Sequence, residues 1–164
     1  MPEPARRRTF SWTSPADAWP ADGTLSGLEV LRRAVNGSLP APPMAELMGM
    51  SMVEVQEGRA VFALHPAEWM YNPSGSVHGG VAATLLDSCM GCAVHSTLAA
   101  GVGYTTTDLH VRYTRAMRTD TGRVLAEGTA VHVGRRMATA EGRLIVEASG
   151  ELLAHASTGC IILG

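Results

Sequence analysis

The sequence contains no lysine, and all 13 of its basic residues are arginines. Catalysis through a lysine Schiff base is therefore excluded. The formal net charge of −2 and the pI near 6.3 also give the chain no general attraction for nucleic acid. Aromatic residues make up only 5% of the sequence, so we expect alanine, valine, leucine and methionine to build the core.

Cysteine is scarce, and the usual signals of a secreted, disulfide-rich protein are missing. The three cysteines are an odd number, and no apolar segment of an export signal follows the arginine run at residues 6–8. We therefore expect a cytoplasmic protein without a disulfide framework. Cys89 and Cys92 lie inside a helical pattern, without a second pair at zinc-binding spacing, and are interpreted as core residues.

Motifs of several common enzyme classes are absent as well. The sequence has no Gly-x-Ser-x-Gly elbow, no P-loop, no dinucleotide fingerprint and no His-Glu-x-x-His motif. These absences argue against a serine hydrolase, a nucleoside triphosphatase and a Rossmann dehydrogenase. We predict that the protein needs no metal and no redox cofactor.

The length of 164 residues suits one domain with one core. Residues 1–22 are rich in proline, alanine and arginine, cannot build a core, and are interpreted as an N-terminal arm. The domain is expected over residues 23–164. Trp12 and Trp19 either pin the arm to the body or belong to a mobile tail, and the composition leaves both possibilities open.

The rest of the pattern predicts an α+β fold. Ser26 and Glu29 have the spacing of a capping box, before a short helix at about 26–36. Between the strands, residues 81–98 form one helix that is apolar on nearly all sides and is therefore expected to be buried. Alternating apolar residues predict a hairpin over 50–64 and strands at about 105–115, 121–133, 136–147 and 150–162.

Asp87 lies in the middle of this apolar helix. Burying a polar group costs roughly 1 to 7 kcal/mol unless it is paired, and an ionised carboxylate costs more. Together with His95, Asp87 argues against a membrane span. We interpret Asp87 as the strongest candidate for a catalytic residue, the alternative being an internal ion pair with an arginine or histidine.

The start of the same helix offers a site for negative charge. His78, Gly79 and Gly80 open the helix, where free backbone N–H groups and the helix dipole favour a developing oxyanion. Gly79 and Asp87 are about 12 Å apart along the helix axis, too far for one carbonyl group to reach both. We therefore expect a dimer with shared active sites, formed by two antiparallel copies of the helix.

The spacing N-x5-H-G-G-x6-D resembles the signature of hotdog-fold acyl-CoA thioesterases of the phenylacetate-pathway (PaaI-type) group, and the resemblance covers about residues 45–162. It implies a hotdog fold, in which one long central helix is wrapped by an antiparallel sheet of about six strands. It also implies homodimers that pair into homotetramers. The residues that carry the match are Asn72, His78, Gly79, Gly80 and Asp87.

The resemblance implies that the protein hydrolyses an acyl-CoA, with an aryl, phenylacetyl or medium-chain acyl group, to the free acid and CoA. Asp87 would act as nucleophile or general base, and the Gly79 N–H would be the oxyanion donor. Asn72 would hold the thioester or the attacking water, or only cap its own turn. His78 would orient the loop or contact the substrate.

Relatives of this group also position water with a hydroxyl residue. Some use the first strand after the helix, where this sequence has threonines at residues 105–107, and we select Thr106. Others use a threonine one helical turn after the acid, which is Gly91 here. This departure favours Thr106.

Coenzyme A carries phosphates, so cationic side chains are expected near the site. The candidates for binding substrate or CoA are Gly80, Arg112, Arg115, Arg135 and Arg136. An alternative function is a non-catalytic acyl-CoA sensor, since hotdog domains also bind acyl-CoA for regulation. A hotdog dehydratase is a third and weaker reading, because those enzymes set an Asp and His pair differently.

Overall fold

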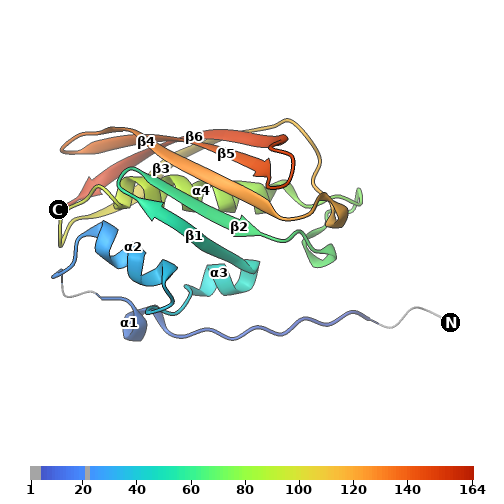
Figure 1. The fold of residues 1–164 in the computed structure, drawn as a ribbon, viewed down its shortest axis with the longest axis horizontal. Coiled ribbons are helices and arrows are strands. Elements are labelled where there is room, and N and C mark those ends of the chain that lie inside the picture. Colours follow the sequence, from blue (N-terminus) through green and yellow to red (C-terminus); the bar gives the residue numbers. More distant parts are fainter. Residues whose placement is uncertain (1–4, 21–22) are drawn as a thin grey trace.

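The computed structural model describes residues 5–20 and 23–164, so parts of the expected arm, residues 1–4 and 21–22, lie outside it. Figure 1 shows a long helix held against a broad antiparallel sheet, with short helices at the edge formed by β1. The elements are α1 (Pro15–Ala18), α2 (Gly27–Val35), α3 (Pro43–Met48), β1 (Met50–Gln56), β2 (Arg59–Leu64), α4 (Gly79–His95), β3 (Gly103–Tyr113), β4 (Val124–Val133), β5 (Met137–Val146) and β6 (Leu152–Leu163), with 3-10 turns at Glu68–Met70 and Thr119–Thr121.

The sheet has six strands in the order β1-β2-β4-β5-β6-β3, and every neighbouring pair is antiparallel. The expected hairpin over 50–64 is β1 and β2, closed at Gly58, whose φ of +76° suits glycine. The strand that follows the helix, β3, pairs only with β6 and forms one edge of the sheet. One helix wrapped by a six-stranded antiparallel sheet is the expected hotdog fold.

Helix α4 is the central element of the core, as its apolar sequence predicts. Leu85, Leu86 and Met90 are fully buried against the sheet. The sheet approaches the helix backbone closely at Gly128, where a Cβ would lie 2.4 Å from the Cys89 carbonyl. Only small residues permit this approach, so the sheet can wrap the helix tightly.

The helix begins and ends earlier than the expected range of 81–98. It starts at Gly79, because His78 caps it, and ends at His95. The hydroxyls of Ser96 and Thr97 donate back to the carbonyls of the last turn, at 2.7 and 2.8 Å, and thereby satisfy backbone groups that would otherwise continue the helix.

Two short helices cover the β1 side of the fold. Helix α2 has the expected capping box, in which Ser26 and Glu29 bond reciprocally, and its Gly27 N–H donates to the Leu98 carbonyl at 3.1 Å. Helix α3 was not expected, because Pro40, Pro42 and Pro43 indicate the end of the preceding helix rather than the start of another one. Proline is compatible with the first turn of a helix, and Pro43 begins α3, which ends at Gly49 with φ +66°.

The arm contacts the body mainly through an arginine. The Arg8 guanidinium donates to the carbonyls of Leu47 and, at 3.2 Å, Glu46 at the end of α3, and lies 3.6 Å from the centroid of the Trp69 ring. Trp12 stacks on Phe10 and remains 59% exposed, whereas Trp19 is half-buried. The boundary between arm and domain at residue 22 stays a prediction.

Candidate active site

The loop before α4 is held by Asn72. Its Oδ1 accepts from the N–H groups of Ser74 at 2.9 Å and Ser76 at 3.4 Å, and its Nδ2 donates to the Ser76 hydroxyl at 3.2 Å. Gly75 completes the turn with φ +78°. In the single chain the Asn72 amide is therefore engaged in its own turn, which corresponds to the second of the two roles considered for it.

His78 and Tyr113 fix the first peptide group of α4. The His78 Nδ1 accepts from the Gly80 N–H at 2.9 Å, and the Tyr113 hydroxyl donates to the Gly79 carbonyl at 3.1 Å. Both groups belong to the peptide plane between Gly79 and Gly80, which is thus clamped on both sides. The Gly79 N–H belongs to the preceding peptide, and no acceptor in the described residues pairs with it. This N–H is therefore free to donate to an acceptor from outside the described residues.

Tyr113 is a site residue that the sequence pattern missed. Its place in the alternating pattern of the strand expected at about 105–115 predicts the face that packs on the core, but it is 55% exposed at the end of β3. Its ring packs so closely on Gly79 that a Cβ there would lie 3.1 to 3.3 Å from the ring atoms. Alternation within a strand predicts which face a residue occupies, but not whether that face is still covered at the strand's end.

Asp87 lies further along α4, beside β3. Thr106 donates its hydroxyl to the Asp87 Oδ1 at 3.0 Å, so the threonine selected from the sequence does contact the acid. A bulge between Thr106 and Asp108 shifts the register of β3, and Thr105 and Thr107 are exposed. No arginine or histidine among the described residues forms an ion pair with Asp87.

Asp87 is less buried than the apolar helix predicted. It is half-buried, together with Ala83, Thr84 and Ser88, on the stripe of α4 that the sheet leaves partly uncovered. The carboxylate is therefore accessible and hydrogen-bonded rather than enclosed in the core.

Gly91, one turn after Asp87, lies under Tyr104. A Cβ at Gly91 would be 2.6 Å from the Tyr104 hydroxyl, so a threonine cannot occupy this position without moving the ring. Burial raises the pKa of Tyr104, and the phenol therefore stays protonated. Burial, and then the charge of Asp87, raise the pKa of Cys92 to about 12, which leaves this thiol unreactive at neutral pH.

The two candidate groups do not meet within one chain. Gly79 is the first residue of α4 and Asp87 follows eight residues later, about 12 Å along the axis. A hollow of about 320 Å³ is lined by His78, Gly79, Tyr113 and Arg115, but not by Asp87. Each chain thus carries two separate halves of the candidate site.

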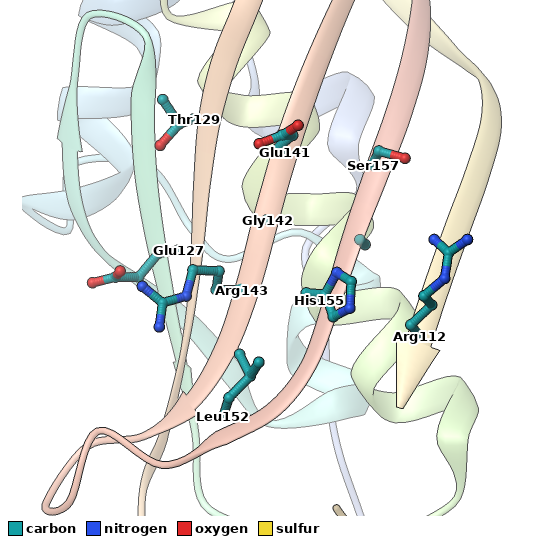
Figure 2. A pocket seen from close by; sticks show the side chains of 10 residues that line it. Arg112, Glu127, Thr129, Glu141, Gly142, Arg143, Leu152, His155 and Ser157 are labelled. Carbon is teal, nitrogen blue, oxygen red and sulfur yellow. The ribbon is translucent and has the colours of Figure 1, made fainter. Parts of the chain in front are cut away.

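The four candidate arginines are dispersed. Arg115 lies beside Gly79, where its Nε pairs with Glu151 at 2.9 Å. Arg112 lies on the opposite face of the sheet from α4, in a hollow of about 820 Å³ that it shares with His155 and Arg143 (Figure 2). That hollow is larger than the one beside Gly79, but neither Asp87 nor Gly79 lines it.

Arg135 and Arg136 lie in the hairpin between β4 and β5. The Arg136 carbonyl accepts from the Ile162 N–H at 2.9 Å, near the end of β6, whereas Arg112 faces His155 near the start of that strand. A single chain therefore does not gather the four arginines into one phosphate site.

The described residues were also compared with the requirements of a metal site and of a membrane-spanning helix, and they meet neither. Among residues 5–20 and 23–164, no three or more histidine, cysteine, aspartate or glutamate side chains come together as metal ligands. In the same residues, none of the helices has both the length and the hydropathy needed to cross a bilayer.

Comparisons with known proteins identify the family. Residues 74–152 match the profile of the Thioesterase superfamily. A Halobacterium salinarum protein, provisionally named an esterase, is 34% identical to this chain over 110 residues. The match covers 64% of this chain and 71% of the relative.

Solved structures show the same fold. A phenylacetic acid degradation-related protein of Ralstonia eutropha has a TM-score of 0.70 and 25% identity, over 79% of this chain and 97% of its own. A protein of Streptococcus mutans, solved with acetyl-CoA bound, has a TM-score of 0.63 and 23% identity, over 70% of this chain and 89% of its own, and it shows the fold alone. The chain therefore belongs to the thioesterase superfamily and has the hotdog fold.

Proposed function

We propose that this protein is an acyl-CoA thioesterase of the PaaI-type group, which uses water to cleave an acyl-CoA into the free acid and coenzyme A. The observation that supports this most is the pair formed by Asp87 and Thr106 on one half of the site, together with the unpaired Gly79 N–H on the other. The acetyl-CoA bound to the Streptococcus mutans protein of the same fold is consistent with a CoA thioester as ligand.

The chemistry follows from these groups. The Gly79 N–H donates to the thioester carbonyl and stabilises the oxyanion as the tetrahedral intermediate forms. On one route, Asp87 takes a proton from the water that attacks the carbonyl. On the other route, Asp87 attacks the carbonyl itself and forms an anhydride, which water cleaves after the thiolate has left. The C–S bond breaks, and the CoA thiolate leaves and takes up a proton. Thr106 orients the Asp87 carboxylate or the water.

A complete site requires a second copy of the chain. In an antiparallel dimer about a two-fold axis, Asp87 of one chain faces Gly79 of the other, which removes the 12 Å separation. Such dimers pair into a tetramer in this proposal. Arg115 beside Gly79 is then placed to bind the CoA phosphates, and a cytoplasmic location stays part of the prediction.

The test is release of thiol from acetyl-, phenylacetyl-, benzoyl- and octanoyl-CoA. The wild-type protein should release thiol from at least one of them, and Asp87→Asn should lower kcat by about 10² to 10⁴-fold, the range for a positioned acid or base. Asp108→Asn is the control, since Asp108 lies on β3 two residues after Thr106 but is exposed.

Two results would contradict the proposal. Full activity in Asp87→Asn removes the assigned residue. Binding of acyl-CoA by the wild-type protein without any thiol release favours the alternative, a non-catalytic acyl-CoA sensor.

A further inference from the structure

A cavity of about 410 Å³ lies between the N-terminal segment and the second half of α4. Trp19 near the end of the arm, α2 and the loop that follows it form one wall, and β1, β2, α4 and β3 form the others. None of the residues assigned to the candidate active site lines it. The lining residues used below are Trp19, Ala34, Phe62, Cys92, His95 and Tyr104.

The walls of the cavity are uncharged. No arginine, aspartate or glutamate is among the lining residues. Burial lowers the pKa of His95, so its imidazole is neutral at pH 7, and the Cys92 thiol is protonated there. An ionised occupant would lose its hydration without gaining a partner, so these walls select a neutral and mainly apolar one.

One polar group in the wall lacks a partner. The indole Nε1 of Trp19 is buried, and no acceptor in the described residues bonds to it. Buried tryptophan N–H groups usually have an acceptor. An oxygen on the occupant would supply one.

The cavity lies beyond Asp87 in the direction of the C-terminal end of α4. Cys92 and His95 follow Asp87 by five and eight residues, about 7.5 and 12 Å along the helix axis. Tyr104 lies over Gly91, between Asp87 and the cavity, and on β3 it precedes Thr106 by two residues. Around the axis, Cys92 is turned by about 140° and His95 by about 80° from Asp87. A chain held at Asp87 by its thioester end therefore reaches the cavity if it runs one to two turns along α4 and bends around the helix towards His95.

We propose, building on the thioesterase function above, that this cavity receives the tail of a medium-chain acyl group that carries a hydroxyl or carbonyl oxygen near its far end. At about 30 Å³ of liquid per water molecule, 410 Å³ corresponds to about 14 waters, which is room for such a tail. An acetyl group ends at Asp87 and does not enter the cavity.

The first test fills the cavity. Ala34 lines it from α2, and the neighbouring Val35 does not and is exposed. Ala34→Phe should lower kcat/KM for octanoyl-CoA and for its terminal-hydroxyl analogue by about tenfold or more, as expected for loss of several methylene contacts. It should leave acetyl-CoA hydrolysis within about twofold, which also shows that the variant is folded.

The control Val35→Phe adds bulk outside the cavity and should change neither substrate. An equal effect of Ala34→Phe on acetyl- and octanoyl-CoA, or no effect on either, overturns the proposal.

The second test removes the unpaired donor. Wild type should prefer the terminal-hydroxyl substrate over octanoyl-CoA by at least about fivefold in kcat/KM, which is the contribution of one hydrogen bond. Trp19→Phe keeps an aromatic ring but has no N–H, and should abolish this preference. If the preference is absent in wild type, or persists in Trp19→Phe, the oxygen is not recognised by Trp19 and the proposal fails.

A binding measurement separates this inference from the proposed function. The amide of the terminal-hydroxyl eight-carbon acid is neutral and not hydrolysed as a thioester, and calorimetry should show that it binds wild type and not Ala34→Phe. Such binding without hydrolysis of any acyl-CoA supports the cavity as a ligand site and refutes the thioesterase assignment. Hydrolysis of acyl-CoA without binding of this amide, and without chain-length discrimination, refutes the cavity assignment alone.

Discussion

At the start of α4, the hydrogen bonds of His78 and Tyr113 determine which backbone N–H group stays unpaired. His78 accepts from the Gly80 N–H, and Tyr113 donates to the Gly79 carbonyl. These bonds hold one peptide plane in place and leave the N–H of Gly79 as the unpaired donor among the described residues. A Cβ at Gly79 would lie 3.1 to 3.3 Å from the Tyr113 ring, so a side chain there requires this exposed ring to move by a few tenths of an ångström.

Replacing Gly79 by proline tests this donor directly. Gly79 is the first residue of the helix, where proline is favoured, and His78 has the extended conformation, with φ −60° and ψ 136°, that precedes a proline well. Gly79→Pro removes only the N–H and should lower kcat by about 10² to 10³-fold relative to Gly79→Ala.

Gly79→Ala is the matched control for that substitution, since it keeps the N–H but adds the same Cβ against Tyr113. Steady-state rates with the best acyl-CoA and circular dichroism spectra of both variants provide the measurement. Equal activity of the alanine and proline variants would show that this N–H does not stabilise the oxyanion.

The Thr106 hydroxyl is the other group whose role a single substitution isolates. Thr106→Val removes the bond to Asp87 and keeps the shape, so we expect kcat to fall by about 10- to 150-fold, the equivalent of one hydrogen bond to a charged group. Thr106→Ser restores the hydroxyl and should recover most of the rate. Loss of activity in the serine variant that equals the loss in the valine variant would argue for a packing role instead.

At the scale of elements, α4 and β3 run antiparallel and meet at three places. Tyr113 contacts Gly79 at one end, Thr106 bonds to Asp87 in the middle, and Tyr104 covers the helix beyond it. The two halves of the candidate site, Gly79 with Tyr113 and Asp87 with Thr106, therefore lie at different points along the same helix–strand pair. The free edge of β3 lies next to both halves.

The contact between Gly91 and Tyr104 leads us to predict how a substitution changes the free energy of unfolding. Alanine normally stabilises a helix by about 1 kcal/mol relative to glycine, but at Gly91 its Cβ would lie 2.6 Å from the Tyr104 hydroxyl. We expect Gly91→Ala to destabilise the protein by about 1 to 3 kcal/mol through this overlap.

Tyr104→Phe removes the overlapping oxygen, so the double variant should recover part of that loss in a double-mutant cycle. Urea unfolding of the four proteins gives the coupling energy. A double variant in which the two effects simply add would show that the helix, and not the tyrosine, accommodates the methyl group.

At the scale of the whole molecule, the proposed function depends on a second chain. Each chain has an accessible carboxylate and an unpaired oxyanion donor, about 12 Å apart along α4. An arrangement in which one chain completes the other explains why both groups are only partly buried.

Mixing two inactive variants tests this shared site. Asp87→Asn lacks the carboxylate and Gly79→Pro lacks the donor, but a heterodimer of the two contains one site in which both are intact. After subunit exchange at equal amounts, half of the dimers are mixed, so about a quarter of the sites should be active. Recovery of thiol release in the mixture, absent from either variant alone, is the expected result. No recovery, with exchange verified by tagged subunits, would contradict a shared site.

Most local elements and the candidate acid followed from the sequence alone, whereas α3 and Tyr113 did not. Ser26 and Glu29 predicted the start of α2, the alternating apolar residues predicted the strands, and an acid in an apolar helix marked Asp87, because these depend on the period and chemistry of neighbouring residues. The hydroxyl partner Thr106 was selected from the resemblance to hotdog thioesterases, which implies such a residue on the first strand after the helix, and it does contact Asp87.

Only the tertiary structure decided how the residues combine. It brought Tyr113 onto Gly79, placed Tyr104 over Gly91, and separated Arg112 from Arg115 by the thickness of the sheet. It also formed a neutral cavity between the N-terminal part of the chain, from Trp19 through α2, and the C-terminal end of α4. These contacts join residues far apart in the chain, and their distances are set by the way the sheet curls around the helix, which no local pattern encodes.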